Sequence, residues 1–370
     1  MKFVFACGGT GGHIFPAFSV AEELKHRDPK TKILYVCGRL DIENEIFRPV
    51  LREEVLSIES APFAGGRSLL SPRFLIKLTK GFAAAADFLK RERPDAVVGF
   101  GGYFSFPVIL AARMRGLPCL IHEQNVVPGV ANLILAPHVS GMALSFAETK
   151  RYLKNDLKTR VTGNPVRLSI ERGPGREEAL EFFGFEKNRK TLLVLGGSQG
   201  AESINTLLLN ALGFFKESFK KNIQVLHLCG RMNPETAEKK IREAGVTGKA
   251  FSFFDRMDLA YAAADLAVGR AGATFLAEIS MKNIPAVLVP YPFGNGHQKL
   301  NAEIFSQTHR AVVSAQADLT AEKLAGHIVG LVLEDGVIAA PSGGFSDERP
   351  NARKLLADFI TETALKNVSP

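Results

Sequence analysis

The stretch that decides the fold is CGGTGGHIFPA, residues 7–17. It follows a strand-like run at residues 2–6, and a helical spacing of apolar residues continues from Ala17 to Leu24. Glycines permit positive φ and carry no Cβ, so backbone N–H groups can approach a ligand closely here. The start of the following helix, which we expect after Pro16, adds the positive end of a dipole. The order strand, glycine loop, helix therefore predicts a site for an anion such as a diphosphate.

This loop matches neither of the two common nucleotide-binding patterns. No GKS or GKT follows it, so it is not a Walker A loop, and Ile14 stands where GxGxxG requires its last glycine. A nicotinamide-dependent dehydrogenase is therefore disfavoured. The remaining alternative is a glycine turn that only packs a helix on a strand.

The same order of elements recurs further along the chain. GGSQGA (196–201), RAGATFLAE (270–278) and GHQKLNAE (296–303) each follow a strand-like run and open a helix. Alternating strands and helices predict an α/β fold with two Rossmann-like domains, whose glycine loops lie at the carboxyl ends of the strands and face a central cleft. We place an N-terminal domain at residues 1–163, a second domain at 164–345, and a helical segment at 346–370 that packs back on the first.

Composition and charge narrow the class of protein. The 370 residues are 46% hydrophobic and 23% charged, typical of a soluble globular protein, and the four cysteines form no CxxC pair. The first 165 residues contain 22 Lys and Arg against 15 Asp and Glu, so they contribute +7 of the total net charge of +8. A basic first half indicates an anionic partner: nucleic acid, a membrane surface or a phosphorylated substrate.

Seven motifs taken together resemble one family. GGTGGH, GFGGY, HEQN, GNPVR, GGSQGA, the RAGA helix with its glutamate, and HQ..NA closely resemble the MurG-type peptidoglycan N-acetylglucosaminyltransferases, in order and spacing from Lys2 to about Gly330. The resemblance implies a GT-B fold and inverting transfer of N-acetylglucosamine from UDP-N-acetylglucosamine to a lipid-linked muramyl-pentapeptide diphosphate (lipid I to lipid II). It implies these two substrates as partners and no nucleic acid. We expect no cofactor and no metal, since no DxD motif appears where a metal–diphosphate bridge would be expected.

The resemblance also assigns residues to two sides of the site. On the acceptor side, the resemblance implies contacts from Thr10, Gly11, Gly12, His13, Tyr103 and Asn125. On the donor side, it implies contacts from Arg167, Ser198, Phe254, Ala273, Thr274, Phe275, Leu276, Ala277, Glu278 and Gln298. Glu278 would accept hydrogen bonds from both hydroxyls of a ribose. The alternative is that Glu278 is a solvated helical glutamate without a ligand. The chain departs from the family at Phe106, at Gly296 and over residues 340–354.

We take His13, Glu123 and Tyr103 as the candidate catalytic residues. His13 has a side chain of suitable basicity at the acceptor loop, and Glu123 of HEQN is its rival as general base. His13 alternatively donates a hydrogen bond to the acceptor diphosphate without removing a proton.

A basic helix in the first half of the chain predicts that the protein associates with a membrane surface. Pro72 begins it, and Leu75, Leu78 and Phe82 fall on the face expected to pack on the sheet. The predicted membrane patch joins apolar and basic side chains: Arg67, Leu69, Leu70, Arg73, Phe74, Ile76, Lys77 and Lys80. We expect a peripheral protein that binds an anionic surface on the cytoplasmic face of the inner membrane. The alternative is a solvated basic helix.

Two other functions remain open from the sequence. Another glycolipid glycosyltransferase of the same fold would share the loops and differ in its acceptor. A non-catalytic sensor of the nucleotide sugar would bind the donor without releasing UDP.

Overall fold

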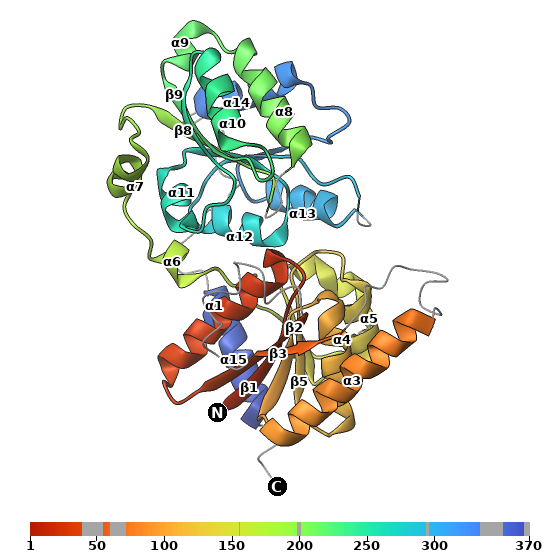
Figure 1. Ribbon diagram of the computed structural model, residues 1–370. Coiled ribbons are helices and arrows are strands. Elements are labelled where there is room, and N and C mark those ends of the chain that lie inside the picture. Colours follow the sequence, from red (N-terminus) through yellow and green to blue (C-terminus); the bar gives the residue numbers. More distant parts are fainter. Residues whose placement is uncertain are drawn as a thin grey trace. The chain divides into compact units, whose positions relative to one another are not determined.

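The protein forms two compact units, each built on its own parallel sheet (Figure 1). The computed structural model describes residues 1–38, 55–59, 72–154, 156–197, 201–293, 296–333 and 351–365, without the side chains of Arg73 and Phe74. Unit 1 comprises Met1–Arg167 with Pro350–Pro370, and unit 2 comprises Leu168–Arg349. The predicted joins, 163/164 and 345/346, lie a few residues before these.

Unit 1 contains a sheet of seven described strands in the order β3-β2-β1-β4-β5-β6-β7, all parallel. The strands are β1 (Lys2–Ala6), β2 (Lys32–Gly38), β3 (Val55–Ile58), β4 (Ala96–Gly99), β5 (Cys119–Glu123), β6 (Gly141–Leu144) and β7 (Thr159–Val161). The order reverses between β1 and β4, so the loops that follow these two strands lie at the switch point, where open parallel sheets bind their ligands.

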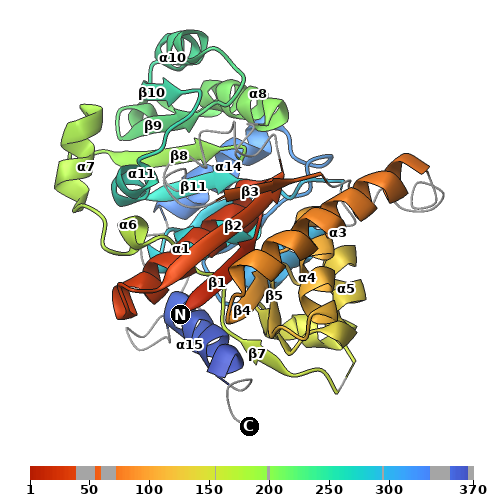
Figure 2. The same ribbon diagram turned by 60° about the horizontal axis from the view of Figure 1, so that its bottom comes forward.

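The two faces of this sheet are covered by different helices. Along β1, Phe3 and Phe5 pack in one core with α1 and α15, while Val4 and Ala6 pack in a second core with α3 and α4, as the strand period of two requires. Figure 2 shows α3, α4 and α5 along one side of the strands and α1 and α15 along the other. The helices of unit 1 are α1 (Gly11–Arg27), α3 (Pro72–Glu92), α4 (Gly102–Met114), α5 (Val130–Leu135), η3 (Ala136–His138), η4 (Ala147–Tyr152) and α15 (Ala352–Leu365).

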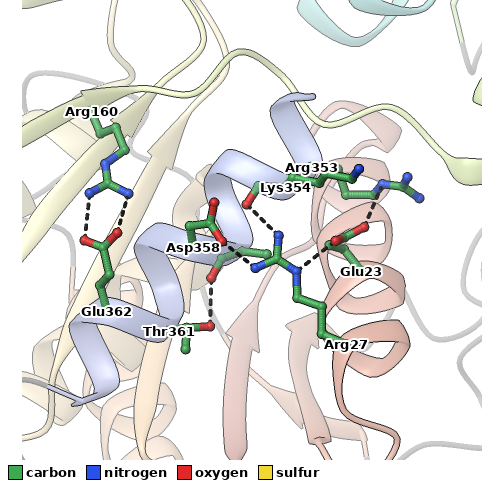
Figure 3. A network of polar contacts seen from close by, with 9 residues as sticks. Glu23, Arg27, Arg160, Arg353, Lys354, Asp358, Thr361 and Glu362 are labelled. Atoms are coloured by element: carbon green, nitrogen blue, oxygen red, sulfur yellow. Dashed lines mark hydrogen bonds and ion pairs between the residues drawn. The ribbon is translucent and has the colours of Figure 1, made fainter. Parts of the chain in front are cut away.

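Helix α15 comes from the far end of the chain and is fastened to unit 1 by ion pairs (Figure 3). Arg27 of α1 contacts Asp358 and, 2.8 Å away, Glu23, whose other oxygen lies 3.6 Å from the buried Arg353. Nearer its end, Glu362 forms a two-pronged pair with Arg160 at 2.9 and 2.7 Å. The last described helix is thus a structural part of unit 1.

Unit 2 contains a sheet of six described strands in the order β10-β9-β8-β11-β12-β13, again all parallel. Its strands are β8 (Lys190–Leu195), β9 (Ile223–Leu228), β10 (Thr247–Phe251), β11 (Leu266–Gly269), β12 (Ala286–Leu288) and β13 (Ala311–Val313). Its helices are α6 (Leu168–Glu171), α7 (Arg176–Phe183), α8 (Glu202–Ala211), η5 (Leu212–Phe214), α9 (Glu217–Lys220), α10 (Pro234–Glu243), α11 (Met257–Ala263), α12 (Ala273–Met281), α13 (His297–Ser306) and α14 (Ala321–Leu333). Helices α8 and α14 share one core with the strands.

Two predictions about helices were wrong. Helix α1 begins at Gly11, because the Thr10 carbonyl accepts from the backbone N–H groups of His13 and Ile14 at 3.0 and 3.2 Å; Pro16, with its helical φ, lies inside the helix. On α3, Leu75 does not pack on the sheet: 47% of its surface is exposed, and the helix meets the core through residues further along, such as Phe82.

Candidate active site

The first glycine loop holds the His13 ring in a defined orientation. Its Nδ1 lies 3.2 Å from the Gly8 carbonyl oxygen and 3.5 Å from Thr10 Oγ1. A carbonyl oxygen only accepts, so Nδ1 carries the hydrogen in the neutral ring and the lone pair lies on Nε2. The geometry thus leaves Nε2 as the basic atom of His13.

A second glycine pair makes room for this ring. Gly101 and Gly102, just after β4, have φ of +86° and +73°. A Cβ on Gly101 would lie 3.2 Å from His13 Nε2, and one on Gly102 would lie 3.3 Å from the Gly8 carbonyl oxygen. Both positions need glycine, for conformation and for space. The motif GFGGY by itself indicates no role for these two glycines; their only sequence signal is that they are adjacent and follow a strand.

Strand β5 ends at Glu123, within HEQN; His122, Glu123 and Gln124 are buried, and Asn125 is partly exposed. His122 Nδ1 accepts from Gln124 Nε2 at 3.1 Å, and His122 Nε2 lies 3.3 Å from the Gly163 carbonyl oxygen. The pKa of His122 is lowered to about 4, chiefly by burial; the hydrogen bond with the Gly163 carbonyl opposes this shift and the nearby His13 adds to it, so His122 is neutral near pH 7. Gln124 Nε2 also donates to the Phe100 carbonyl at 2.8 Å, which ties the end of β5 to the end of β4.

Glu123 is buried and points into the loop that follows β5. Its Oε1 accepts from the backbone N–H and Nδ2 of Asn125 at 2.9 and 3.2 Å, and its Oε2 accepts from Gly129 N and Asn132 Nδ2 at 2.9 and 2.8 Å. Asn132, which sequence reasoning missed, therefore belongs to this loop. An asparagine nine residues after a glutamate carries no sequence signal of such a contact.

Two further predicted residues of unit 1 take part in aromatic contacts. The Tyr103 ring lies 4.1 Å from the Phe104 ring at the start of α4 and is partly buried. The guanidinium of Arg167, predicted on the donor side, lies 4.2 Å from the centre of the Phe15 ring on α1. Within unit 1, Arg167 is thus placed next to the helix that the first glycine loop opens.

In unit 2 the turn after β11 contains a buried cation that sequence reasoning did not single out. Arg270 is 9% exposed and donates to the carbonyls of Val289 and Pro290 at 3.0 and 3.3 Å, to Ser203 Oγ at 2.9 Å and to Gln316 Oε1 at 2.6 Å. All four acceptors are neutral, and no described carboxylate pairs with this guanidinium. Burial lowers the pKa of Arg270 from its usual value. An uncompensated buried cation at the carboxyl end of the sheet favours an anionic ligand there.

Helix α12 begins immediately after this turn and contains most of the predicted donor residues. Ala273, Phe275, Leu276 and Glu278 are buried, while Thr274 and Ala277 are partly exposed. The Glu278 carboxylate is 5% exposed, and its Oε2 accepts from Tyr261 OH at 2.7 Å. Glu278 is therefore not the solvated helical glutamate of the alternative.

Three predicted donor residues remain: Phe254, Gln298 and Ser198. The Phe254 ring packs among Phe182, Phe183 and Phe251, with ring centres 4.9 to 6.1 Å apart. Gln298 Oε1 accepts from Tyr291 N at 2.9 Å, which leaves its amide nitrogen for other contacts. Ser198 lies outside the described residues.

Comparison with known proteins decides the family. The N-terminal domain of glycosyltransferase family 28 matches residues 3–144, and the C-terminal domain of that family matches residues 191–354. A Halothermothrix orenii protein named UDP-N-acetylglucosamine--N-acetylmuramyl-(pentapeptide) pyrophosphoryl-undecaprenol N-acetylglucosamine transferase is 39% identical, covering 98% of this chain and 99% of the relative. A Nocardioides sp. protein of the same name is 35% identical over 99% of both chains. The chain belongs to the MurG family.

Solved structures agree with membership of the MurG family. The crystal structure of Acinetobacter baumannii MurG superposes with a TM-score of 0.73 at 27% identity, covering 98% of this chain and 99% of that one. A UDP-N-acetylglucosamine 2-epimerase from Listeria monocytogenes reaches a TM-score of 0.69 at only 13% identity, which shows a common fold alone. The two Rossmann-like units therefore form the GT-B architecture predicted from the sequence.

The described residues contain neither a membrane-spanning helix nor a cluster of metal ligands. Among them, no helix combines the length and apolarity needed to cross a bilayer. In the same ranges, no three His, Cys, Asp or Glu side chains gather in a way that would hold a metal ion.

Proposed function

We propose that this MurG-family chain transfers N-acetylglucosamine from UDP-N-acetylglucosamine to the lipid-linked muramyl-pentapeptide diphosphate, lipid I, and forms lipid II. The observation that carries the proposal is the 39% identity over almost the whole of both chains to a relative named for this transfer. The product supplies peptidoglycan synthesis and, through it, cell shape and division.

The proposed chemistry on the acceptor side uses His13. The acceptor hydroxyl attacks C1 of the donor sugar, the bond from C1 to the UDP oxygen breaks with inversion, and the hydroxyl proton goes to His13 Nε2. The contact of Nδ1 with the Gly8 carbonyl supports this role, because it keeps the lone pair on Nε2 and stabilises the imidazolium that forms. Thr10, Gly11 and Gly12 would hold the acceptor diphosphate at the start of α1, with Tyr103 and Asn125 beside the acceptor sugar.

The donor side would stabilise the departing UDP with fixed charge. Arg270 and the start of α12 at Ala273 supply it, together with Arg167 and Ser198 at the diphosphate. Glu278 would accept from the ribose hydroxyls, the backbone of Phe254 would contact the uracil, and Gln298 would contact the sugar. Glu278→Ala should then weaken UDP binding by about 2–3 kcal/mol, and unchanged UDP affinity by calorimetry would contradict this assignment.

The decisive experiment measures UDP release from UDP-N-acetylglucosamine with a lipid I analogue and with other glycolipid acceptors. We expect release with the lipid I analogue and product carrying one added N-acetylglucosamine. Release only with another acceptor would favour a different glycolipid glycosyltransferase of this fold. Donor binding without release on any acceptor would favour a sensor.

We also propose that α3 holds unit 1 against an anionic membrane on the cytoplasmic face. Ile76, 53% exposed, and the exposed Lys77 and Lys80 support this; Arg67, Leu69 and Leu70 lie outside the described residues, as do the side chains of Arg73 and Phe74. Each basic residue near such a surface contributes about 1 kcal/mol. Sedimentation with anionic and neutral vesicles should show salt-sensitive binding that is lost when Arg73, Lys77 and Lys80 are changed to Glu. Equal binding by both proteins would exclude the patch.

A further inference from the structure

The carboxylate of Glu123 is surrounded by donors that come from one short segment. Asn125, Gly129 and Asn132 supply two backbone N–H groups and two side-chain amides, at 2.8 to 3.2 Å. Glu123 itself is 2% exposed. The segment 125–132 leads from the end of β5 into α5, so the chain bends around this one carboxylate.

A general base needs a lone pair that faces the substrate. An ionised carboxylate has about four lone-pair positions on its two oxygens, and the four donors around Glu123 occupy that number. In His13 the contact with the Gly8 carbonyl oxygen is made by Nδ1, so the lone pair of the neutral ring is on Nε2 and is not used by that contact. The two candidate bases therefore separate by geometry.

The loop is held on its other side as well. Thr149 of η4 is fully buried, and its Oγ1 donates to the Asn125 carbonyl at 3.1 Å. Asn132 Nδ2 bridges Glu123 Oε2 and the His122 carbonyl, at 2.8 and 3.3 Å, while its buried Oδ1 has no hydrogen-bond partner among the described residues. The amide of Asn132 is thus oriented by what it donates to, and it in turn orients Glu123.

We infer that Glu123 is a positioning residue: its carboxylate shapes the loop 125–129, which presents Asn125 to the acceptor, and it does not take the acceptor's proton. This inference rests on the proposed function for the identity of the acceptor. Its structural half, the shaping of the loop, does not. Asn132 is a second positioning residue of the same loop, acting through Glu123.

The experiment uses the full chain with Glu123→Gln, Asn132→Ala and His13→Ala, and Glu362→Gln as a matched loss of a carboxylate elsewhere in unit 1. Hydrogen exchange of peptides covering residues 122–135 reports the loop without any substrate. Steady-state kinetics over a pH range report kcat and the KM for a lipid I analogue. In Glu123→Gln an amide nitrogen would face N–H donors, so we expect faster exchange at Asn125 and Gly129.

The same variant should raise the acceptor KM by about ten- to one-hundred-fold, as expected when hydrogen bonds to a charged group are lost. Its kcat should fall less, and the acidic limb of the pH profile should persist. Asn132→Ala should change exchange and KM in the same direction and by less, and Glu362→Gln should match wild type. Only His13→Ala should remove the acidic limb.

The opposite pattern would overturn the inference: unchanged exchange in Glu123→Gln, with kcat lost, acceptor KM kept and the acidic limb gone. If Glu123→Gln does not fold, Asn132→Ala tests the inference instead. Hydrogen exchange and an acceptor KM equal to those of wild type in Asn132→Ala would also overturn the inference. If wild-type protein transfers nothing to the lipid I analogue, the proposed function fails. The exchange measurement then still tests whether Glu123 shapes the loop.

Discussion

A buried charge lies at the carboxyl end of each sheet, Glu123 in unit 1 and Arg270 in unit 2, and these two charges have opposite signs. In unit 1 the anion Glu123 accepts from four N–H groups of the loop after β5. In unit 2 the cation Arg270 donates to two carbonyls, a hydroxyl and an amide oxygen from three separate segments. Neither has a described partner of opposite charge.

Glu123 and Arg270 differ in how much of their charge remains to attract a ligand. The donors around Glu123 occupy its carboxylate oxygens, and the proposed function assigns the proton transfer of unit 1 to His13 instead. The acceptors around Arg270 carry no net charge, so its positive charge remains available to an anion at the same edge of the sheet. The proposed function accordingly gives unit 1 the proton transfer and unit 2 the stabilisation of the leaving group by fixed charge. The predictions below test this division.

Removing the proton acceptor of unit 1 should have the largest effect. His13→Ala should lower kcat by about 10²–10⁴-fold with little change in donor KM, because the base acts only in the transition state. Stopped assays of UDP release over pH 5–9 measure this. Retention of the acidic limb in the variant would transfer the role of base to another group.

Acid should destabilise both units through one buried histidine in each. Burial lowers the pKa of His122 in unit 1 and of His227 in unit 2 to about 4. The unfolded chain binds these protons near pH 6.5, so stability is fully present above that pH and falls as pH drops towards 4, by roughly 3 kcal/mol for each histidine. Urea unfolding at several pH values measures this loss.

A matched pair of variants isolates the effect of one histidine. His227 Nε2 lies 2.9 Å from Asn205 Oδ1, so His227→Gln can keep that donor while it removes the titrating group. The variant should lose less stability between pH 6.5 and 4, whereas His26→Gln, at an exposed position, should match wild type. The same acid loss in His227→Gln and wild type would contradict the assignment.

Neutralising the cation of unit 2 should weaken the binding of charged ligands selectively. Arg270→Met should reduce UDP affinity on the order of 10–100-fold, since a charge-assisted attraction is lost, and should change uridine affinity little. Arg270→Lys should fall between. Titration calorimetry with uridine, UMP and UDP distinguishes attraction of the phosphate charge from a purely structural role of Arg270. An equal loss of affinity for all three ligands would mean a purely structural role.

A smaller effect is expected at the hydrogen bond that orients Glu278. Tyr261→Phe removes one donor and should weaken UDP binding by about 0.5–1.5 kcal/mol. If Tyr261 acts through Glu278, the two substitutions should not add in a double-mutant cycle. Strict additivity would separate Tyr261 from the ribose contact.

The smallest effect is expected at an ion pair that contacts neither Glu123 nor Arg270. Glu362 is about half exposed in its pair with Arg160, so Glu362→Gln should cost less than about 1 kcal/mol of stability and leave kinetics unchanged. Thermal unfolding measures it. A loss of several kcal/mol would show that α15 is held to unit 1 chiefly by this pair, rather than by its buried apolar face.

The sequence predicted the sheets better than the positions where helices begin. Strand residues such as Phe3, Val4 and Phe5 are apolar on both faces, a pattern that parallel strands require and that is read locally. The start of α1 was misplaced because Pro16 ordinarily opens a helix, whereas here the helix begins at Gly11, five residues earlier, with the Thr10 carbonyl accepting its first hydrogen bonds. The face of α3 was misjudged at Leu75, which is exposed, because the buried residues of this helix, Ala85, Phe88 and Leu89, lie towards its other end.

By itself the sequence determined the α/β class, the positions of the glycine loops and the family, since each depends on residues close together in the chain or on motifs in a given order. Only the tertiary structure decided which charges are compensated. Glu123 meets Asn132 nine residues away, Gly101 makes room for a histidine of another loop, and Arg270 joins Ser203 to Gln316. Hydrogen bonds and burial depend on distances in space, and the packing of distant segments sets those distances.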